Sequence, residues 1–233
     1  VTGAGLDELR AQLAAEAAVT RSRDCGGRFR LAVDRCFVLK GTGVVVTGTA
    51  HSGTVAIEDR LIVSPGGLEV RVRGIHAQNA AAERGGAGQR CALSLTGPNL
   101  DKDHVDRGDW LVAPELHQPT SKLDVELRVT PHAGRPLRHW TPVHVHLGAA
   151  RITGRVAVLE GDEIAAGASG LAQLVLDKPT VALRGDRFIL PAERATGITE
   201  PEPGACIVAI EPDLALEHLH RLLAQVVAGR EHK

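Results

Sequence analysis

The segment from Lys40 to Ala50, Lys-Gly-Thr-Gly-Val-Val-Val-Thr-Gly-Thr-Ala, constrains the fold more than any other part of the chain. Its three consecutive valines form a β-branched run that is bounded by glycine on both sides and is too short for a helix. The run therefore predicts a buried strand that follows a tight turn. A phosphate-binding loop is excluded, because such a loop needs Gly-Lys-Ser/Thr after its second glycine and valines stand there instead.

Alternation of apolar and polar residues predicts further strands along most of the chain from Phe29 onward. In the clearest case Leu123, Val125 and Leu127 alternate with charged residues. More strands are expected around residues 152–159, 171–176, 181–189 and 205–210, and glycine-rich turns separate them. Short strands at this density favour small closed barrels. We therefore predict a mainly β chain with two consecutive small β-barrels, flanked by short helices.

Two helices are expected at the ends. Leu6, Leu9 and Leu13 fall at helical spacing with acidic residues in the first turn, and we interpret this helix as the last one of an upstream domain. Since the chain begins at Val1 and has no methionine, we expect its natural start to lie upstream. The expected organisation is a helix at 1–15, a linker at 16–28, a first barrel at 29–116, a second barrel at 120–212 and a helical segment at 213–233.

Composition limits the possible partners and location. With 27 basic and 28 acidic residues the formal charge is −1, so any contact with RNA must be a local patch. Aromatic residues make up only 2% of the chain, too few for stacking platforms of the kind found in single-strand-binding proteins. The four cysteines show no CxxC spacing, and no apolar run approaches membrane-spanning length, so we expect reduced thiols in the cytoplasm and no membrane.

Several phrases in combination carry a family resemblance. Four segments carry it: residues 40–50, Phe-Arg-Leu-Ala-Val-Asp-Arg-Cys-Phe at 29–37, Gly-Gln-Arg at 88–90 and Arg-Gly-Asp-Trp-Leu at 107–111. Together they resemble the selenocysteine-specific elongation factor (SelB) family. This family is related to elongation factor Tu, and the likeness runs from about Val1 to Pro212. It implies that the two barrels are translation-factor domains 2 and 3, of which the first holds the aminoacyl end of a tRNA and the second supports its acceptor and T arms.

Within this resemblance the amino-acid pocket falls on Asp34, Arg35 and Arg90. A selenol is more acidic than a thiol, so selenocysteine is anionic near neutral pH whereas serine is neutral. Arginine is always charged and relatively weakly hydrated, and it therefore suits a soft anion. With seryl-tRNA the same arginines lack their anion, a penalty of about 2–4 kcal/mol, or roughly 30- to 1000-fold in affinity. Asp34 either orients Arg35 or meets the α-amino group. Taken alone, an Asp-Arg dipeptide is typical of a solvated surface pair.

The His-x-His segment of the second barrel permits more than one interpretation. His144 and His146 share a strand face, as in some zinc sites, but no third ligand at a standard spacing is evident, so no metal is expected. With Arg151 and Arg155 they form a candidate patch for tRNA phosphates, or simply a solvated face.

The resemblance also implies partners beyond this chain. The intact factor is expected to be a GTPase that binds GTP and Mg²⁺ in an upstream domain and carries selenocysteinyl-tRNA to the ribosome at recoded UGA codons. It is further expected to reach a selenocysteine-insertion mRNA hairpin through winged-helix domains downstream of residue 213. No cofactor and no catalytic group are expected in the present chain.

Two alternatives remain. The chain could belong to another Tu-like tRNA carrier, such as elongation factor Tu or an initiation-factor γ subunit, or to a cytosolic β-barrel enzyme that uses Cys36 or the histidines. Like Cys36, Cys91 directly follows a pocket arginine, and alternation along a strand predicts that both thiols point to the core. The chain also departs from the family at Pro191-Ala192, where strand pairing should stop early, and at Glu202-Pro203.

Overall fold

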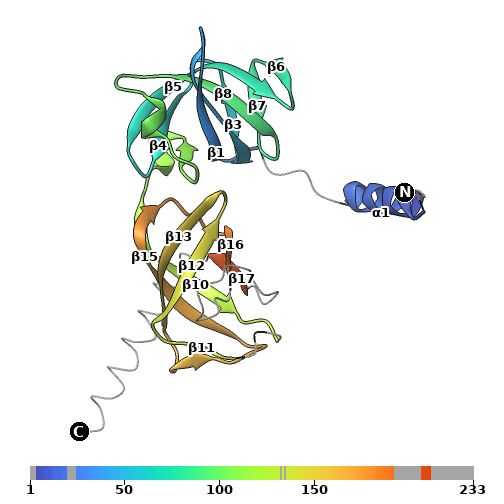
Figure 1. Ribbon diagram of the computed structural model, residues 1–233, viewed down its shortest axis with the longest axis vertical. Coiled ribbons are helices and arrows are strands. Elements are labelled where there is room, and N and C mark those ends of the chain that lie inside the picture. Colours follow the sequence, from blue (N-terminus) through green and yellow to red (C-terminus); the bar gives the residue numbers. More distant parts are fainter. Residues whose placement is uncertain (1–3, 20–24, 132, 134, 192–205, 211–233) are drawn as a thin grey trace.

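The computed structural model describes residues 4–19, 25–131, 133, 135–191 and 206–210. Two β-barrels follow one another along this part of the chain, and its single α-helix precedes them (Figure 1). In Figure 1 the first barrel lies above the second, and a short connection joins them. The prediction of a mainly β chain with two consecutive barrels is confirmed.

Helix α1 (Leu6–Val19) lies at the N-terminal end of the described residues. Its leucines, Leu6, Leu9 and Leu13, are all exposed. A helix is thus found within the range 1–15 where we expected one, but it continues to Val19, into the segment 16–28 that we expected to be a linker. The cause is local, because alanine and glutamate, which are strong helix formers, follow the last leucine. The helix expected at 213–233 lies outside the described residues.

The first barrel is built from the strands that follow residue 29. They are β1 (Arg30–Leu39), β2 (Gly43–Ser52), β3 (Thr54–Ala56), β4 (Arg60–Ser64), β5 (Leu68–Ala77), β6 (Ala80–Ala82), β7 (Arg84–Gly86), β8 (Arg90–Thr96) and β9 (Trp110–Val112). Seven of them pair in the order β4-β9-β1-β2-β8-β5-β6, and β4 also pairs with β5, so six strands form a ring. Strands β3 and β7 form a separate ribbon. Two short 3₁₀ helices, η1 (Lys102–His104) and η2 (Pro114–Leu116), flank β9.

The glycine-flanked segment forms the hairpin between β1 and β2. The amide of Thr42 donates to the carbonyl of Leu39 at 3.0 Å, which closes the turn. Gly41 and Gly43 have φ angles of 83° and 92°, a region that glycine adopts without strain. Val46, which follows, is fully buried. The tight turn and the buried strand are thus present where the sequence predicts them.

The second barrel uses the strands after residue 119. They are β10 (Thr120–Arg128), β11 (Leu137–Arg138), β12 (Thr141–Leu147), β13 (Ala150–Val158), β14 (Glu163–Ile164), β15 (Ser169–Thr180), β16 (Arg187–Leu190) and β17 (Cys206–Ile210). Six of these close a barrel in the order β10-β15-β13-β12-β16-β17, while β11 and β14 pair separately. Along β10 the side chains of Leu123, Val125 and Leu127 are buried, as their alternation predicts.

The strand predicted over 181–189 is wrong for most of its length. Strand β16 begins only at Arg187, because the preceding residues form a turn. In that turn the amide of Asp186 donates to the carbonyl of Leu183 at 3.0 Å, and the amide of Leu183 donates to the Asp186 carboxylate at 2.9 Å. Strand β16 ends at Leu190, directly before Pro191, which has no amide hydrogen to donate. The second departure, at Glu202-Pro203, lies outside the described residues.

The two barrels share part of a core and one buried ion pair. Ala32, Trp110 and Val112 belong to strands of the first barrel but pack in the hydrophobic cluster of the second. Arg30 is only 4% exposed, and both of its terminal nitrogens donate to the carboxylate of Asp186, Nη1 at 2.6 Å. Its guanidinium lies 4.5 Å from the ring centroid of Trp110. The turn before β16 therefore supplies the carboxylate that joins the second barrel to the first.

Candidate functional site

A β-bulge at Asp34 places the predicted pocket residues on the outer face of the first barrel. Val33 pairs with Gly48 and Arg35 with Thr47, so Asp34 is an extra residue in β1. Leu31 and Val33 face the core, and strict alternation would turn Arg35 inward as well. The bulge reverses the parity, so that Arg35 is exposed and Cys36 packs against the core.

Strand pairing brings the second arginine to the same face. Arg90, the first residue of β8, pairs with Thr49 of β2, and Thr47 lies two residues before Thr49 in β2. Side chains of paired residues, and of residues two apart in a strand, share a face of the sheet. Arg35, Thr47 and Arg90 thus lie together on the outer side of β1-β2-β8, as the predicted pocket requires.

Asp34 pairs with Arg90, a partner that the sequence did not single out. Arg90 donates through Nη2 to Oδ1 of Asp34 at 3.1 Å and through Nη1 to Oδ2, while Thr47 Oγ1 donates to Oδ1 at 2.6 Å. Burial by itself raises the pKa of Asp34, but the hydrogen bonds from Arg90 and Thr47 outweigh it and hold the pKa below its ordinary value. The same hydrogen bond and the charge of Asp34 raise the pKa of Arg90. Both groups are therefore charged at neutral pH.

Arg35 differs from Arg90 in its contacts. It is exposed and makes no hydrogen bond or ion pair with the described residues, although its charge contributes to the lowered pKa of Asp34. Two guanidiniums and one carboxylate leave a net charge of +1 at this face. The arrangement can hold one anionic group at Arg35 while Asp34 keeps the guanidinium of Arg90 in place.

Exposed apolar side chains continue the same face and were not predicted as part of the site. Phe37 and Leu39 lie two and four residues after Arg35 in β1, and each is exposed. Phe37 pairs with Val45 of β2, which is buried although it belongs to the same outer face. The sequence alone indicates that these residues share the face of Arg35, because residues two and four apart in a strand point the same way. The bulge, which only the structure shows, turns that face outward.

The predicted contacts of the second barrel also share one outer face. His146 pairs with Arg151 and His144 with Thr153, and Arg155 lies two residues further along β13. Arg151 Nε donates to His144 Nδ1 at 3.3 Å. Burial, together with the charges of Arg151 and His144, lowers the pKa of His146, so this imidazole adds little charge to the face at neutral pH. No three His, Cys, Asp or Glu side chains of the described residues gather in a way that could hold a metal ion.

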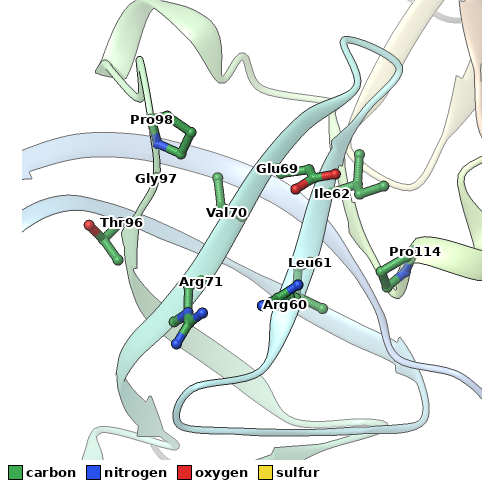
Figure 2. A pocket seen from close by; sticks show the side chains of 10 residues that line it. All are labelled: Arg60, Leu61, Ile62, Glu69, Val70, Arg71, Thr96, Gly97, Pro98 and Pro114. Carbon is green, nitrogen blue, oxygen red and sulfur yellow. The ribbon is translucent and has the colours of Figure 1, made fainter.

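A hollow of about 700 Å³ on the first barrel lies away from these residues. Figure 2 shows its lining, in which Arg60 and Ile62 of β4 lie beside Glu69 and Arg71 of β5. The loop at 96–98 and Pro114 flank it. None of Asp34, Arg35 and Arg90 contributes to it, because β4 is on the opposite side of the six-strand ring from β2. The hollow therefore adds nothing to the predicted pocket.

The cysteine environments bear on the alternative of a thiol enzyme. Burial raises the pKa of Cys91, and burial followed by nearby aspartates raises the pKa of Cys36. A raised pKa suppresses the thiolate, which is the nucleophilic form. Both thiols face the core, as predicted, whereas Cys25 is exposed.

Thiol labelling at neutral pH should follow this order of exposure. In a Cys206→Ser background, we expect a disulfide reagent to modify Cys25 first, Cys36 much more slowly, and Cys91 only after unfolding. The rates are measured by mass spectrometry of time points with and without urea. Rapid labelling of Cys36 in the folded chain would restore the thiol-enzyme alternative.

None of the helices in the described part of the chain has the length and apolar character needed to cross a membrane.

Comparison with known proteins identifies relatives along most of the chain. A family model described as the β-barrel domain of the selenocysteine-specific elongation factor matches residues 124–199. The selenocysteine-specific elongation factor of Haemophilus influenzae is 44% identical over 191 residues, which cover 81% of this chain and 29% of that protein. The factor of Escherichia coli is 39% identical over 210 residues, 90% of this chain and 31% of that protein. The chain thus spans about three tenths of the length of these relatives.

Solved structures with the same name share the fold. The apo form of translation elongation factor SelB from Methanococcus maripaludis is 22% identical with a TM-score of 0.72, covering 89% of this chain and 48% of that one. A bacterial selenocysteine-specific elongation factor, EF-Sec, is 24% identical with a TM-score of 0.69, covering 89% of this chain and 32% of that one. At these identities the likeness establishes the barrel fold alone. The sequence relatives and the matching β-barrel model place the chain in the family of selenocysteine-specific elongation factors.

Proposed function

We propose that this chain binds selenocysteinyl-tRNA for GTP-dependent delivery to the ribosome at recoded UGA codons. The first barrel, expected at 29–116, holds the aminoacyl end, and the second, expected at 120–212, supports the body of the tRNA. Family membership supports the choice of selenocysteinyl-tRNA as the substrate, and the two barrels provide the surfaces that would bind it.

One observation carries the assignment of the pocket. Arg35 and Arg90 lie on one exposed face with a single carboxylate between them, and that carboxylate is hydrogen-bonded to Arg90 alone of the two arginines. The unpaired guanidinium of Arg35 then meets the selenolate, and the guanidinium of Arg90, held by Asp34, provides a second positive charge beside it. Asp34 acts as a positioning residue for Arg90. Neighbouring Phe37 and Leu39 offer apolar surface for the rest of the aminoacyl end.

The second barrel contributes the face of His144, His146, Arg151 and Arg155. Positively charged side chains on one face contact phosphates without reading sequence, which suits a role in supporting the tRNA backbone. The other partners are assigned to regions outside this sequence. The mRNA hairpin belongs to a downstream region, and the proposed location is the cytoplasm.

The glycine-rich turn of the first barrel does not fit a phosphate-binding loop. The turn at Gly41 and Gly43 joins two paired strands, and valine rather than Lys-Ser/Thr follows it. On the basis of family membership we assign GTP and Mg²⁺ to an upstream domain, and no step of GTP hydrolysis to residues of this chain.

Replacing Arg35 or Arg90 by alanine is expected to weaken binding of selenocysteinyl-tRNA by roughly 30- to 1000-fold, while binding of seryl-tRNA changes by only a few-fold. The loss at Arg90 should be at least as large as that at Arg35, because it also leaves the Asp34 carboxylate unpaired beside the selenolate. Dissociation constants for the same tRNA charged with either amino acid, measured at fixed ionic strength, test the expectation.

The matched control is Arg60→Ala, which removes an exposed arginine on the opposite side of the same barrel. This variant should bind both charged tRNAs as the unmodified chain does. Equal losses for the two tRNAs in Arg35→Ala and Arg90→Ala contradict the pocket and leave only a general tRNA contact.

A further inference from the structure

Trp140 is an exposed indole held outward by a rigid turn. It lies between β11 and β12 and is 48% exposed, whereas the other tryptophan, Trp110, is 1% exposed. Its φ angle is 64°, a left-handed conformation that is uncommon for a bulky residue and that a turn must stabilise. The amide of Trp140 donates to the carbonyl of Val156 at 2.6 Å, and Thr141 Oγ1 donates to the carbonyl of Arg138 at 2.7 Å. The ring is therefore displayed by fixed backbone and not by a free loop.

Cationic and aromatic side chains surround the indole. The guanidinium of Arg155 lies 5.8 Å from the ring centroid, and its Nη1 donates to the carbonyl of Trp140 at 3.4 Å. The imidazole of His139 lies 6.0 Å away with an interplanar angle of 23°. Such packing restrains the ring without covering it, since nearly half of Trp140 stays accessible.

The indole stands at one end of a polar strip on the outer face of β12 and β13. The strip consists of Arg151, Thr153 and Arg155 on β13 and of His144 and His146 on β12. Two acidic groups lie at or near it. Glu163 pairs with Arg138 at 3.3 Å, whereas Asp177 accepts a hydrogen bond from Thr153 Oγ1 and keeps its negative charge. Arg151 and Arg155 outnumber this one carboxylate, so the strip presents net positive charge beside an aromatic ring.

We propose that Trp140 stacks on an unpaired base of an RNA that lies along this strip, with Arg151 and Arg155 beside its phosphates. The proposal rests on the proposed function, which makes RNA the partner of the second barrel. Bases in a duplex are stacked on both faces, so a protein ring can stack only on a base in a loop, bulge or end. One ring accommodates one base, which agrees with the small number of aromatic residues in the chain.

A protein partner is less well matched to this surface. Recognition by apolar contact needs a contiguous exposed apolar patch. Beside Trp140 the outer face holds one exposed apolar residue, Pro142, opposite Arg155, and the rest of the strip is charged or polar. The next exposed large apolar side chain is Ile189, which pairs with His146 at the far end of the strip. An isolated indole beside guanidiniums is the combination that binds nucleobases by stacking and phosphates by charge.

The two tryptophans make the test direct. Because Trp110 is buried, a change in tryptophan emission during titration with RNA reports on Trp140. We expect a transcript of selenocysteine tRNA to quench the emission saturably, and a single-stranded oligouridylate to quench it more weakly. An RNA duplex of equal charge should bind without quenching. Trp140→Asn, which tolerates the left-handed backbone, should weaken binding of the transcript by roughly 5- to 150-fold. Trp140→Phe, which keeps a ring, should retain most of the affinity.

The outcomes separate this proposal from the proposed function. Saturable binding of the transcript without quenching, or equal affinity for Trp140→Asn and the unmodified chain, overturns stacking at Trp140. In that case the discrimination by Arg35 and Arg90 between selenocysteinyl- and seryl-tRNA is unaffected. If Arg35 and Arg90 do not discriminate between the two charged tRNAs but RNA still quenches Trp140, the selenocysteine pocket is contradicted and stacking at Trp140 is upheld. If Trp140→Asn also melts at a lower temperature, the emission of the unmodified chain decides. Saturable quenching of Trp140 by the transcript then upholds stacking, and its absence overturns it.

Discussion

Replacing Asp186 by alanine is expected to lower the free energy of unfolding by about 3–5 kcal/mol, because it leaves the buried guanidinium of Arg30 without its counter-ion. The two side chains are only 5% and 10% exposed, so water cannot readily take the place of the carboxylate. Arg30 Nε already lacks a hydrogen-bond partner among the described residues. Urea unfolding followed by circular dichroism measures the change.

A surface ion pair of the second barrel provides the control. Arg138 and Glu163 are 3.3 Å apart, and their side chains are 78% and 45% exposed. Glu163→Ala should therefore cost no more than about 1 kcal/mol. The double variant Arg30→Met with Asp186→Leu, which removes both buried charges, should be more stable than Asp186→Ala alone. A cost below about 1 kcal/mol for Asp186→Ala contradicts the burial of this pair.

Replacing Gly48 by alanine is expected to destabilise the first barrel by about 3 kcal/mol or more. A Cβ atom at this position would lie 2.0 Å from the carbonyl oxygen of Ala32 and 2.6 Å from Cδ2 of Leu31. The first of these is a backbone atom, so β1 itself must move away from β2. Because Gly48 pairs with Val33 directly beside the bulge, the displacement also disturbs Asp34 and its contact with Arg90. Binding of selenocysteinyl-tRNA should fall together with stability.

Gly74 is the matched control for that substitution. It also lies in a strand of the first barrel, but a Cβ there would meet only the Cβ of Ser94 at 3.7 Å, an ordinary contact. Gly74→Ala should therefore change the unfolding free energy by less than about 1 kcal/mol. Chemical denaturation of both variants under identical conditions decides the matter. Equal stability of Gly48→Ala and Gly74→Ala shows that β1 and β2 can separate without cost.

The barrels and most strands could be predicted because their signals are local. Leu123, Val125 and Leu127 repeat with period two. This period predicts which side chains point into the core even when the partner strand is unknown. The same reasoning placed Cys91 in the core beside an exposed Arg90. It failed at 181–186, where apolar and polar residues also mix but hydrogen bonds between Leu183 and Asp186 close a turn.

The amino-acid sequence by itself thus determined the β class and the two barrels, since short-range periodicity encodes them. The pocket at Asp34, Arg35 and Arg90 stays a prediction from the family resemblance. The tertiary structure decided which partner each charged group takes. Asp34 meets Arg90 across 56 residues, and Arg30 meets Asp186 across 156. It also decided the face on which Arg35 appears, because a single extra residue in β1 reverses the parity of every side chain after it. Such contacts depend on strand register and on the packing of one barrel against the other, and no local pattern in the chain specifies either.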